Sequence, residues 1–450
     1  MGKLFGTDGI RGKANHYPMT PAMAVKIGMA VSFLCNEDGS RPVIVIGKDT
    51  RLSGDMLEAA LVAGICSMGK DVCLTGILPT PGVAWMTSTE EDAFAGISIS
   101  ASHNPFYDNG IKIFSKDGFK LSEEKESEIE AWALNDQENL IPKPVHETGR
   151  VYPIINATER YAAFLSATVP PTCSFKGMKI IIDCANGATY RIAPGLFNGL
   201  GADTECFYDA PDGKNINANC GSEHPEVLKK HVIEKGADIG LAFDGDGDRF
   251  IAVDETGNII SGDQILAICA KHMKQRDALK NNMVVSTVMS NVGLGAALKE
   301  MEIIHVLTDV GDRHVVQKML ASGAVLGGED SGHMIFLNHH TTGDGIISAL
   351  QLLSIMQAES KPLSELSRIM TVFPQTLINV EVKRKPDIDT VAGIRDVIQS
   401  VEKKLGEKGR VLVRYSGTQS LCRVMVEGPS DSEIQQYCRQ IAATVSKEIG

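Results

Sequence analysis

The chain has 450 residues, of which 43% are hydrophobic, and its formal net charge is −12. This length is too great for a single hydrophobic core, so several domains are expected, and the acidic balance argues against a nucleic-acid partner. No apolar run approaches the roughly 18 residues of a membrane span, which argues against a membrane partner.

Cysteine usage indicates a reducing compartment. The ten cysteines are scattered, mostly in apolar stretches, and form no Cys-x-x-Cys pair. Reduced buried thiols explain this pattern better than disulfides or zinc ligands. The first residues, Met-Gly-Lys-Leu-Phe-Gly, lack the apolar region of a signal peptide. We therefore expect a soluble cytoplasmic protein.

The first part of the chain alternates helices and strands, which is typical of an α/β domain. Residues 5–12, Phe-Gly-Thr-Asp-Gly-Ile-Arg-Gly, predict a tight loop that offers Thr7 and Arg11 to a ligand, although an ordinary glycine-rich turn fits equally well. The next expected elements are a helix from an N-cap at Thr20 to Cys35, a strand over 42–47, a helix capped by Ser53, and a strand over 71–74.

A small-residue strand over 95–101 runs directly into the polar loop Ser102-His-Asn-Pro105. Because Pro105 cannot continue the strand, the Ser102 hydroxyl is presented at its carboxyl end, where open α/β sheets bind ligands. Taken alone, a Ser-His pair in a turn is more often a device for hydrogen bonding to the backbone. A turn at 108–110 and a strand containing Lys112 are expected next.

A triple-carboxylate loop follows a second apolar strand, expected over 238–243. Asp244-Gly-Asp-Gly-Asp-Arg249 places three carboxylates at alternate positions, and the glycines between them let all three face one point. Oxygen ligands of this kind favour a hard cation, with Mg²⁺ preferred to Ca²⁺. An EF-hand loop is excluded because Arg249 occupies its glycine position and the flanks predict strands. The alternative is a solvated acidic turn.

Two further polar loops lie in the second half of the chain. Gly327-Gly-Glu-Asp-Ser-Gly-His333 follows a short apolar stretch; Glu329 and Ser331 are candidates for sugar hydroxyls, and His333 for titration near neutral pH. Arg414-Tyr-Ser-Gly-Thr-Gln-Ser420, with Arg423 beyond it, is a candidate phosphate cradle but no Walker A loop. The flanking elements are expected as strands over 376–382, 410–415 and 422–427, a helix over 388–404, and a helix opened by Ser430 with Glu433.

Together these loops predict phosphoryl transfer on a phosphosugar. A hydroxyl carries the phosphoryl group, a cation neutralises it, and the arginine loop holds a second phosphate. Ordered motifs along the chain resemble those of the α-D-phosphohexomutase superfamily. They are Thr-Asp-Gly-Ile-Arg-Gly (7–12), Ser-Ala-Ser-His-Asn-Pro (100–105), Asp-Gly-Asp-Gly-Asp-Arg (244–249), Gly-Glu-Asp-Ser-Gly-His (328–333) and the loop 414–423.

Within the superfamily the resemblance is greatest to the bacterial phosphoglucosamine mutases, on residues 5–12, 183–188, 215–217 with 220–222, 287–291, 310–313 and 341–345. It implies three topologically related α/β domains and a smaller C-terminal α+β domain around a central cleft. The expected boundaries are 1–155 for the phosphoserine domain, 156–255 for the metal domain, 256–370 for the sugar domain and 371–450 for the phosphate domain. A homodimer is also suggested by the family.

The resemblance further implies a role for each candidate residue. Ser102 is expected to carry a phosphoryl group and, with Asp244, Asp246 and Asp248, to bind one Mg²⁺; a hexose 1,6-bisphosphate is the expected intermediate and activator. Lys112, Arg11, His333 and His103 fall on positions tied to catalysis, and the residue that moves the proton stays open. The remaining assignments are Glu329, Ser331 and Gly332 to the sugar, Arg414, Ser416, Gly417, Thr418 and Arg423 to the non-reacting phosphate, and Arg249 and Thr7 to the same site.

The resemblance has one departure. The superfamily members closest to this chain usually continue the phosphate loop as Ser-Gly-Thr-Glu-Pro, whereas Gln419 and Ser420 stand here. Preference for glucosamine phosphates over mannose or glucose phosphates therefore stays open. Two other classes remain as alternatives: a phosphosugar-binding protein without turnover, and a Mg²⁺-dependent phosphatase.

Overall fold

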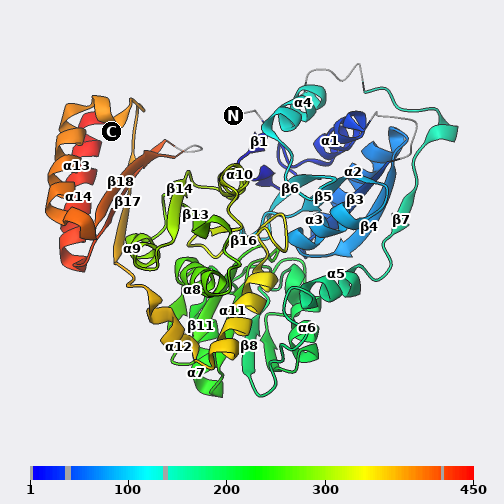
Figure 1. Cartoon of the computed structure of the whole chain (residues 1–450). Helices are drawn as coiled ribbons and strands as arrows, with labels where there is room; N and C mark the ends of the chain where they lie inside the picture. The colour runs from blue at the N-terminus through cyan, green and yellow to red at the C-terminus, as the bar shows by residue number, and fades with distance from the viewer. Residues whose placement is uncertain (1–3, 36–41, 135–139, 417–419) are drawn as a thin grey trace. The chain divides into compact units, whose positions relative to one another are not determined.

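The computed structural model describes residues 4–35, 42–134, 140–416 and 420–450 (Figure 1). The chain forms two compact units, one of Met1–Met289 with Ile303–Arg368 and one of Ser290–Glu302 with Ile369–Gly450. Among the described residues, three mixed sheets lie in the first unit and one antiparallel sheet lies in the second. The predicted class, α/β units with a smaller α+β part at the C-terminus, is confirmed.

The first sheet has the strand order β1-β2-β6-β5-β3-β4-β7. Helices cover both faces: Ile97 of β5 packs in one core with α1, α2 and α4, whereas its neighbour Gly96 faces Thr87 of α3. Because both faces are covered, the polar Ser98 of β5 is buried as well as Ile97. The elements are β1 (Phe5–Gly6), β2 (Gly9–Lys13), α1 (Pro21–Leu34), β3 (Val43–Lys48), α2 (Gly54–Ser67), β4 (Asp71–Ile77), α3 (Thr80–Thr89), β5 (Ala93–Ile99), β6 (Asp108–Ser115), α4 (Glu123–Leu134), β7 (Val151–Pro153) and α5 (Ala157–Ser166).

The second and third sheets have the orders β12-β11-β10-β8-β9 and β14-β13-β15-β16. The second contains β8 (Lys179–Asp183), β9 (Asp203–Phe207), β10 (Ile239–Phe243), β11 (Phe250–Asp254) and β12 (Ile259–Ile260), with α6 (Ala193–Gly199) and α7 (Glu226–Lys235). The third contains β13 (Met283–Thr287), β14 (Ile304–Thr308), β15 (Leu326–Gly328) and β16 (Met334–Phe336), with α8 (Gly262–Gln275), α10 (Asp312–Ser322), α11 (Gly345–Glu359) and α12 (Leu363–Leu366).

All three sheets share one four-strand pattern, in which three neighbouring strands are parallel and a fourth is antiparallel. The corresponding runs are β4-β3-β5-β6, β9-β8-β10-β11 and β14-β13-β15-β16. In each run the loop that leads into the fourth strand carries a predicted motif: Ser102, the Asp244–Asp248 carboxylates, or Glu329 to His333. Related topology therefore places the three motifs in equivalent positions.

The second unit is a three-stranded antiparallel sheet of order β17-β19-β18 packed against α13 and α14. Its elements are α9 (Val292–Glu300), β17 (Gln375–Glu381), α13 (Ala392–Leu405), β18 (Arg410–Tyr415), β19 (Leu421–Glu427) and α14 (Asp431–Ile449). Ile434, Cys438, Ile441 and Val445 of α14 are buried, as their spacing predicts. The Ser430 side chain accepts from the Glu433 N–H, which confirms the predicted N-cap.

Some local predictions are wrong. Ser53 stands at the N-cap of α2 but makes no capping bond; its hydroxyl instead accepts from Asn109 Nδ2 at 2.8 Å. The turn expected at 108–110 is the beginning of β6, and α13 begins at Ala392 rather than 388. All ten cysteines are free thiols, as expected. No helix among the described residues is both long enough and apolar enough to cross a membrane.

Candidate active site

Ser102 lies in the loop between β5 and β6, buried and with a positive φ of 52°. Its hydroxyl donates to Asp244 Oδ2 at 2.6 Å and lies 3.3 Å from His103 Nδ1. Left-handed backbone at a residue other than glycine costs about 1–3 kcal/mol and is typical of functional loops. The predicted serine and the predicted carboxylate loop, 142 positions apart in the sequence, are thus in direct contact.

The three carboxylates form a buried cluster. One oxygen from each of Asp244, Asp246 and Asp248 lies within 4.8 Å of the other two. Asp246 Oδ1 and Asp248 Oδ1 are buried without a hydrogen-bond partner. Unpartnered buried anionic oxygens are costly, and a hard cation satisfies them. The cluster fits a divalent ion with oxygen ligands, as the sequence predicts.

The pKa values of Asp244 and Asp248 are shifted in opposite directions by their surroundings. Burial raises the pKa of Asp244 well above its usual range, and Asp248 and Asp246 add to this effect. Burial acts in the same direction on Asp248, but Lys112 and His333 outweigh it and hold its pKa well below the usual range. Asp244 is therefore the carboxyl of the cluster whose negative charge is least stabilised by its protein neighbours.

Lys112 of β6 reaches the same cluster. It is paired in register with Ser98 of β5, and its ammonium lies 2.9 Å from Asp246 Oδ2 and 3.2 Å from Asp248 Oδ2. Burial alone lowers the pKa of Lys112, but Asp246, Asp8 and Asp248 raise it well above the usual value. Lys112 is therefore a fixed positive charge beside the carboxylates.

Lys112 belongs to a closed ring of six ion-paired side chains whose charges alternate in sign. Lys112 Nζ lies 3.3 Å from Asp8 Oδ2, and Lys120 pairs with both Asp8 and Asp312. His333 completes the ring, with Nε2 3.7 Å from Asp312 Oδ2 and Nδ1 3.6 Å from Asp248 Oδ1. Its members in order are Lys112, Asp8, Lys120, Asp312, His333 and Asp248. The ring therefore joins β6 and two loops of the first sheet to the Asp244–Asp248 loop, to the loop before β16 and to the beginning of α10.

His333 is cationic in this ring. Burial lowers its pKa, but Asp248, Asp312 and Glu329 outweigh burial and raise the pKa to about 9. The imidazole of His333 also has little free space, because a Cβ on Gly343 would lie 2.3 Å from His333 Nε2. The prediction that His333 titrates near neutral pH is therefore wrong, since the neighbouring carboxylates stabilise its imidazolium form.

The three remaining candidates near Ser102 are Arg11, Arg249 and His103. The guanidinium of Arg11 pairs with Asp8 and donates to Ala101 O at 3.4 Å. Arg249 donates its backbone N–H to Asp244 Oδ1 at 3.2 Å and pairs with Glu223. Burial, with Arg249 and Arg11 nearby, lowers the pKa of His103 to about 4. His103 is therefore neutral at pH 7.

The predicted sugar loop, Gly327 to His333, forms a closed turn that packs against Phe250, just after the Asp244–Arg249 loop. Glu329 N–H donates to His333 O, and Glu329 Oε1 accepts from the Gly311 N–H at 3.1 Å. Gly332 has a φ of 88°, and a Cβ there would lie 2.1 Å from Phe250 O. Ser331 is half-buried in the same turn. Glycine at 332 thus lets the sugar loop approach the beginning of β11.

The predicted phosphate loop lies in the second unit. Arg414 of β18 is the direct cross-strand partner of Arg423 of β19, and Ser416 is buried just after β18. Burial and the charge of Arg423 lower the pKa of Arg414. Two like charges opposite each other are unfavourable unless an anion lies between them. Gly417 and Thr418, together with Gln419, lie outside the described residues.

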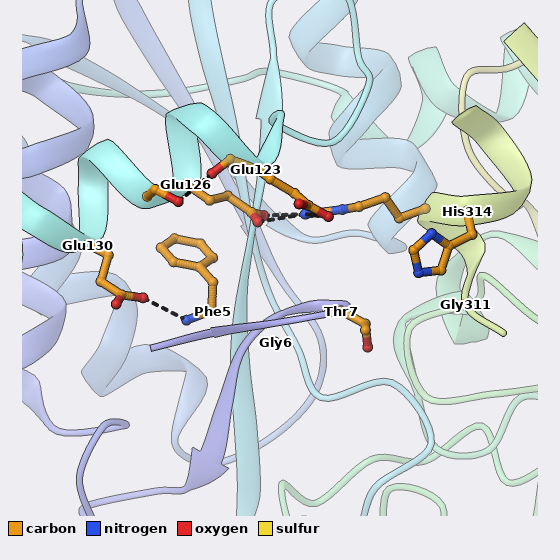
Figure 2. Close-up of a pocket in the computed structure, with 10 residues that line it drawn as sticks. Phe5, Gly6, Thr7, Glu123, Glu126, Glu130, Gly311 and His314 are labelled. Atoms are coloured by element: carbon orange, nitrogen blue, oxygen red, sulfur yellow. Dashed lines mark hydrogen bonds and ion pairs between the residues drawn. The ribbon is translucent and has the colours of Figure 1, made fainter. Parts of the chain in front are cut away.

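Thr7 lines a pocket of about 220 Å³. Gly311 and His314 line the same pocket, and Figure 2 shows Glu126 and Glu130 of α4 on the opposite side of the view from His314. Two site neighbours, Arg51 and Thr80, were not predicted. Thr80 donates to Asp246 Oδ2 at 2.6 Å, and Arg51 binds the Ser102 loop. The segment Lys48-Asp-Thr-Arg51 at the end of a predicted strand was the available signal for Arg51.

Four family models match the chain in order. Models described as phosphoglucomutase/phosphomannomutase α/β/α domains I, II and III match residues 2–140, 159–257 and 261–373, and the C-terminal domain model matches 377–444. The chain belongs to the phosphoglucomutase/phosphomannomutase family. The superfamily resemblance on the sequence motifs is thereby confirmed.

Two full-length bacterial relatives of this family member are named phosphoglucosamine mutase. The protein of Syntrophus aciditrophicus is 58% identical and that of Syntrophobacter fumaroxidans 57% identical, with 100% of each chain covered. Among solved structures, a phosphoglucomutase/phosphomannomutase family protein from Burkholderia thailandensis has a TM-score of 0.82 at 23% identity, covering 100% of this chain and 98% of that one.

A further solved relative has a phosphosugar bound. The N-acetylphosphoglucosamine mutase of Aspergillus fumigatus, in complex with GlcNAc-6P and magnesium, has a TM-score of 0.71 at 17% identity, covering 100% of this chain and 96% of that one. At these identities the solved structures establish the phosphohexomutase fold. The family is therefore carried by the sequence models and bacterial relatives, and the fold by all the comparisons.

Proposed function

We propose that this chain is a phosphoglucosamine mutase that interconverts glucosamine 6-phosphate and glucosamine 1-phosphate. The observation that carries the proposal is the 2.6 Å hydrogen bond from Ser102 Oγ to Asp244 Oδ2, which joins a buried hydroxyl to a cation-binding cluster. Two full-length relatives that bear this enzyme's name, at 58% and 57% identity, support the choice of substrate.

Ser102 Oγ carries the phosphoryl group in this proposal. The bond from Oγ to phosphorus breaks as a bond from a sugar hydroxyl to phosphorus forms, and the proton of that hydroxyl passes to a base. The resulting 1,6-bisphosphate reorients, and its other phosphoryl group bonds to Ser102 Oγ as its bond to the sugar oxygen breaks and that oxygen takes up the proton. Lys112 and Arg11, both cationic beside the serine, stabilise the charge of the transferring group. The neutral His103, 3.3 Å from Oγ, and His333 are the groups available for proton movement.

Asp244, Asp246 and Asp248 would hold one Mg²⁺ together with the Ser102 oxygen. The fit rests on two buried carboxylate oxygens that accept no hydrogen bond, Asp246 Oδ1 and Asp248 Oδ1, and on the oxygen-only ligand set. Bound there, Mg²⁺ supplies positive charge that offsets the negative charge of the phosphoryl group. A hexose 1,6-bisphosphate serves as activator because it can charge an unmodified Ser102.

The remaining candidates would orient the sugar phosphate. Glu329, Ser331 and Gly332 form the turn that faces the sugar hydroxyls. Arg414, Ser416, Gly417, Thr418 and Arg423 hold the non-reacting phosphate, and the cross-strand pair of arginines supports this role. Arg249 and Thr7 belong to the same site in this proposal. The four domains have separate tasks: 1–155 carries the phosphoserine, 156–255 binds the metal, 256–370 binds the sugar and 371–450 binds the non-reacting phosphate.

The protein is proposed to act in the cytoplasm on a small-molecule phosphosugar, without nucleic-acid or membrane partners, and as a homodimer. Ten free thiols support a reducing compartment.

The test is mass spectrometry of the purified protein beside a coupled mutase assay. We expect one phosphate on the peptide that contains Ser102, lost on incubation with glucosamine 6-phosphate and Mg²⁺. Ser102→Ala should retain sugar-phosphate binding and lose turnover, whereas Ser88→Ala, an exposed serine of α3, should retain both. Full turnover by Ser102→Ala would end the phosphoserine mechanism.

Substrate choice and reaction class are tested in the same assay. Comparing kcat/KM for glucosamine, mannose and glucose phosphates decides the substrate, and a preference for mannose or glucose phosphate would favour a phosphomannomutase or phosphoglucomutase. Steady release of inorganic phosphate without isomer formation would indicate a phosphatase instead. A mutase retains the phosphoryl group because its closed site excludes water.

A further inference from the structure

Two carbonyls of the Ser102 loop each accept hydrogen bonds from two different segments. Arg51 Nη2 lies 2.8 Å from Ser102 O and 2.8 Å from Asn104 O. Asn217 Nδ2 approaches the same two oxygens, at 2.8 Å and 3.0 Å. Arg51 follows β3 of the first sheet, and Asn217 belongs to the Asn215-Ile-Asn217 segment beside the second sheet. The backbone around Ser102 is therefore clamped by both α/β parts.

Arg51 uses its whole guanidinium on this loop and its anchor. Nη1 donates to Pro105 O and to Asp108 O, and Nε donates to Asp49 Oδ2 at 2.8 Å. The side chains of Arg51 and Asp49 are both fully buried. Five donors in a rigid planar fork define one geometry, which a flexible ammonium cannot reproduce.

The same network holds the other side of the Ser102 peptide. Asp49 Oδ2 accepts from Ser100 Oγ at 2.7 Å, and Ser100 Oγ accepts from the Ser102 N–H at 2.9 Å. Both backbone polar groups of Ser102 are thereby tied, directly or through Ser100, to the Asp49–Arg51 pair. This pairing maintains the positive φ of 52° at Ser102 against its steric cost.

The carboxylate loop closes tightly over the clamp. A Cβ on Gly245 would lie 2.6 Å from Ser102 O and 2.7 Å from Asn217 Nδ2. The Ser102 carbonyl is thus packed between Arg51, Asn217 and the glycine that separates Asp244 from Asp246. A change in the clamp moves Ser102 Oγ relative to Asp244.

We propose that Arg51 and Asn217 are positioning residues that set the direction of Ser102 Oγ toward the carboxylate cluster. The proposal rests on the proposed role of Ser102 as phosphoryl carrier. Neither residue needs to touch the sugar phosphate, because both act through the carbonyls of residues 102 and 104. Loss of the clamp should therefore lower the rate of transfer and leave substrate binding unchanged.

The test compares Asn217→Ala and Arg51→Lys with wild type, using Asn215→Ala as the matched control. Asn215 lies two positions away, and its amide donates to Ala210 O instead. We expect kcat to fall about 10- to 100-fold in both clamp variants, because misplacing a reacting atom by about 1 Å costs up to about 10²-fold. KM should stay within about twofold of wild type, as for an interaction made only in the transition state. Asn215→Ala should match wild type.

Hydrogen exchange at the Ser102 amide gives a readout that does not depend on activity. We expect faster exchange in Asn217→Ala than in wild type or Asn215→Ala, with an unchanged melting temperature. Wild-type kcat in both clamp variants, or a loss confined to KM, would overturn the proposal. If wild-type Ser102 transfers no phosphate, the proposed function fails, and exchange alone decides the clamp: an unchanged rate in Asn217→Ala would reject it.

Discussion

The bidentate pair between Arg313 of α10 and Glu126 of α4 offers a sharp test of the electrostatics of the first unit. Arg313 Nη1 donates to Glu126 Oε2 at 2.7 Å, Nη2 donates to Oε1, and the two side chains are only 9% and 7% exposed. Figure 2 shows Glu126 reaching from α4 toward the segment that begins α10. The pair therefore joins the first sheet's helix layer to the third sheet's helix layer.

Removing one partner should cost far more than removing both. Burial raises the pKa of Glu126 although Arg313 acts in the opposite direction, so desolvation of this carboxylate exceeds its gain from pairing. Glu126→Leu leaves a guanidinium that cannot lose its proton, and the expected cost is about 3–5 kcal/mol of unfolding free energy. Arg313→Met leaves a carboxylate that can take up a proton, so its cost should shrink as the pH is lowered. The double variant should lie close to wild type.

Urea unfolding followed by tryptophan fluorescence measures these costs, because both tryptophans, Trp85 and Trp132, lie in α3 and α4 of the first sheet's helix layers. A loss of about 3–5 kcal/mol corresponds to a midpoint shift of about 1–3 M. Arg160→Met, which breaks a half-exposed pair with Glu90, is the control and should cost at most about 1 kcal/mol. Single-variant losses that simply add in the double variant would refute the reasoning.

Three further predictions follow from the site and its surroundings. Gly343→Ala places a methyl against the imidazole of His333 and should lower kcat by about 10²-fold. Gly195→Ala is the control, because its Cβ would lie in open space, and it should keep the wild-type kcat. Equal kcat values for the two variants would contradict the confinement of His333. Lys120→Met leaves Asp8 and Asp312 without their shared cation and should lower the melting temperature more than Lys120→Arg, which keeps the charge; equal melting temperatures would show that the charge ring adds no stability. Burial raises the pKa of Asp183 to about 6, so the folded state holds this proton more tightly than the unfolded chain. As the pH rises from about 4 to about 7, the unfolding free energy of wild type should fall by about 3 kcal/mol relative to that of Asp183→Asn. Parallel pH profiles of thermal unfolding for the two proteins would disprove this.

Several features of this protein were determined by the sequence alone. The Asp244-Gly-Asp-Gly-Asp repeat predicts a cation site because carboxylate spacing and glycine freedom are local properties of the chain. The strand that precedes the Ser102 loop and the helix opened by Ser430 are likewise local, since the pattern of burial and capping depend on neighbouring residues.

The tertiary structure decided how these pieces meet. Lys112 reaches the carboxylates because antiparallel pairing of β6 with β5 sets the face to which its side chain points. Ser53 does not cap α2 as predicted, because its hydroxyl instead accepts a hydrogen bond from Asn109, 56 positions away. Arg51 and Asn217 converge on Ser102 from 51 positions before it and 115 after it. Such contacts depend on sheet register and domain packing, which no local pattern of residues encodes.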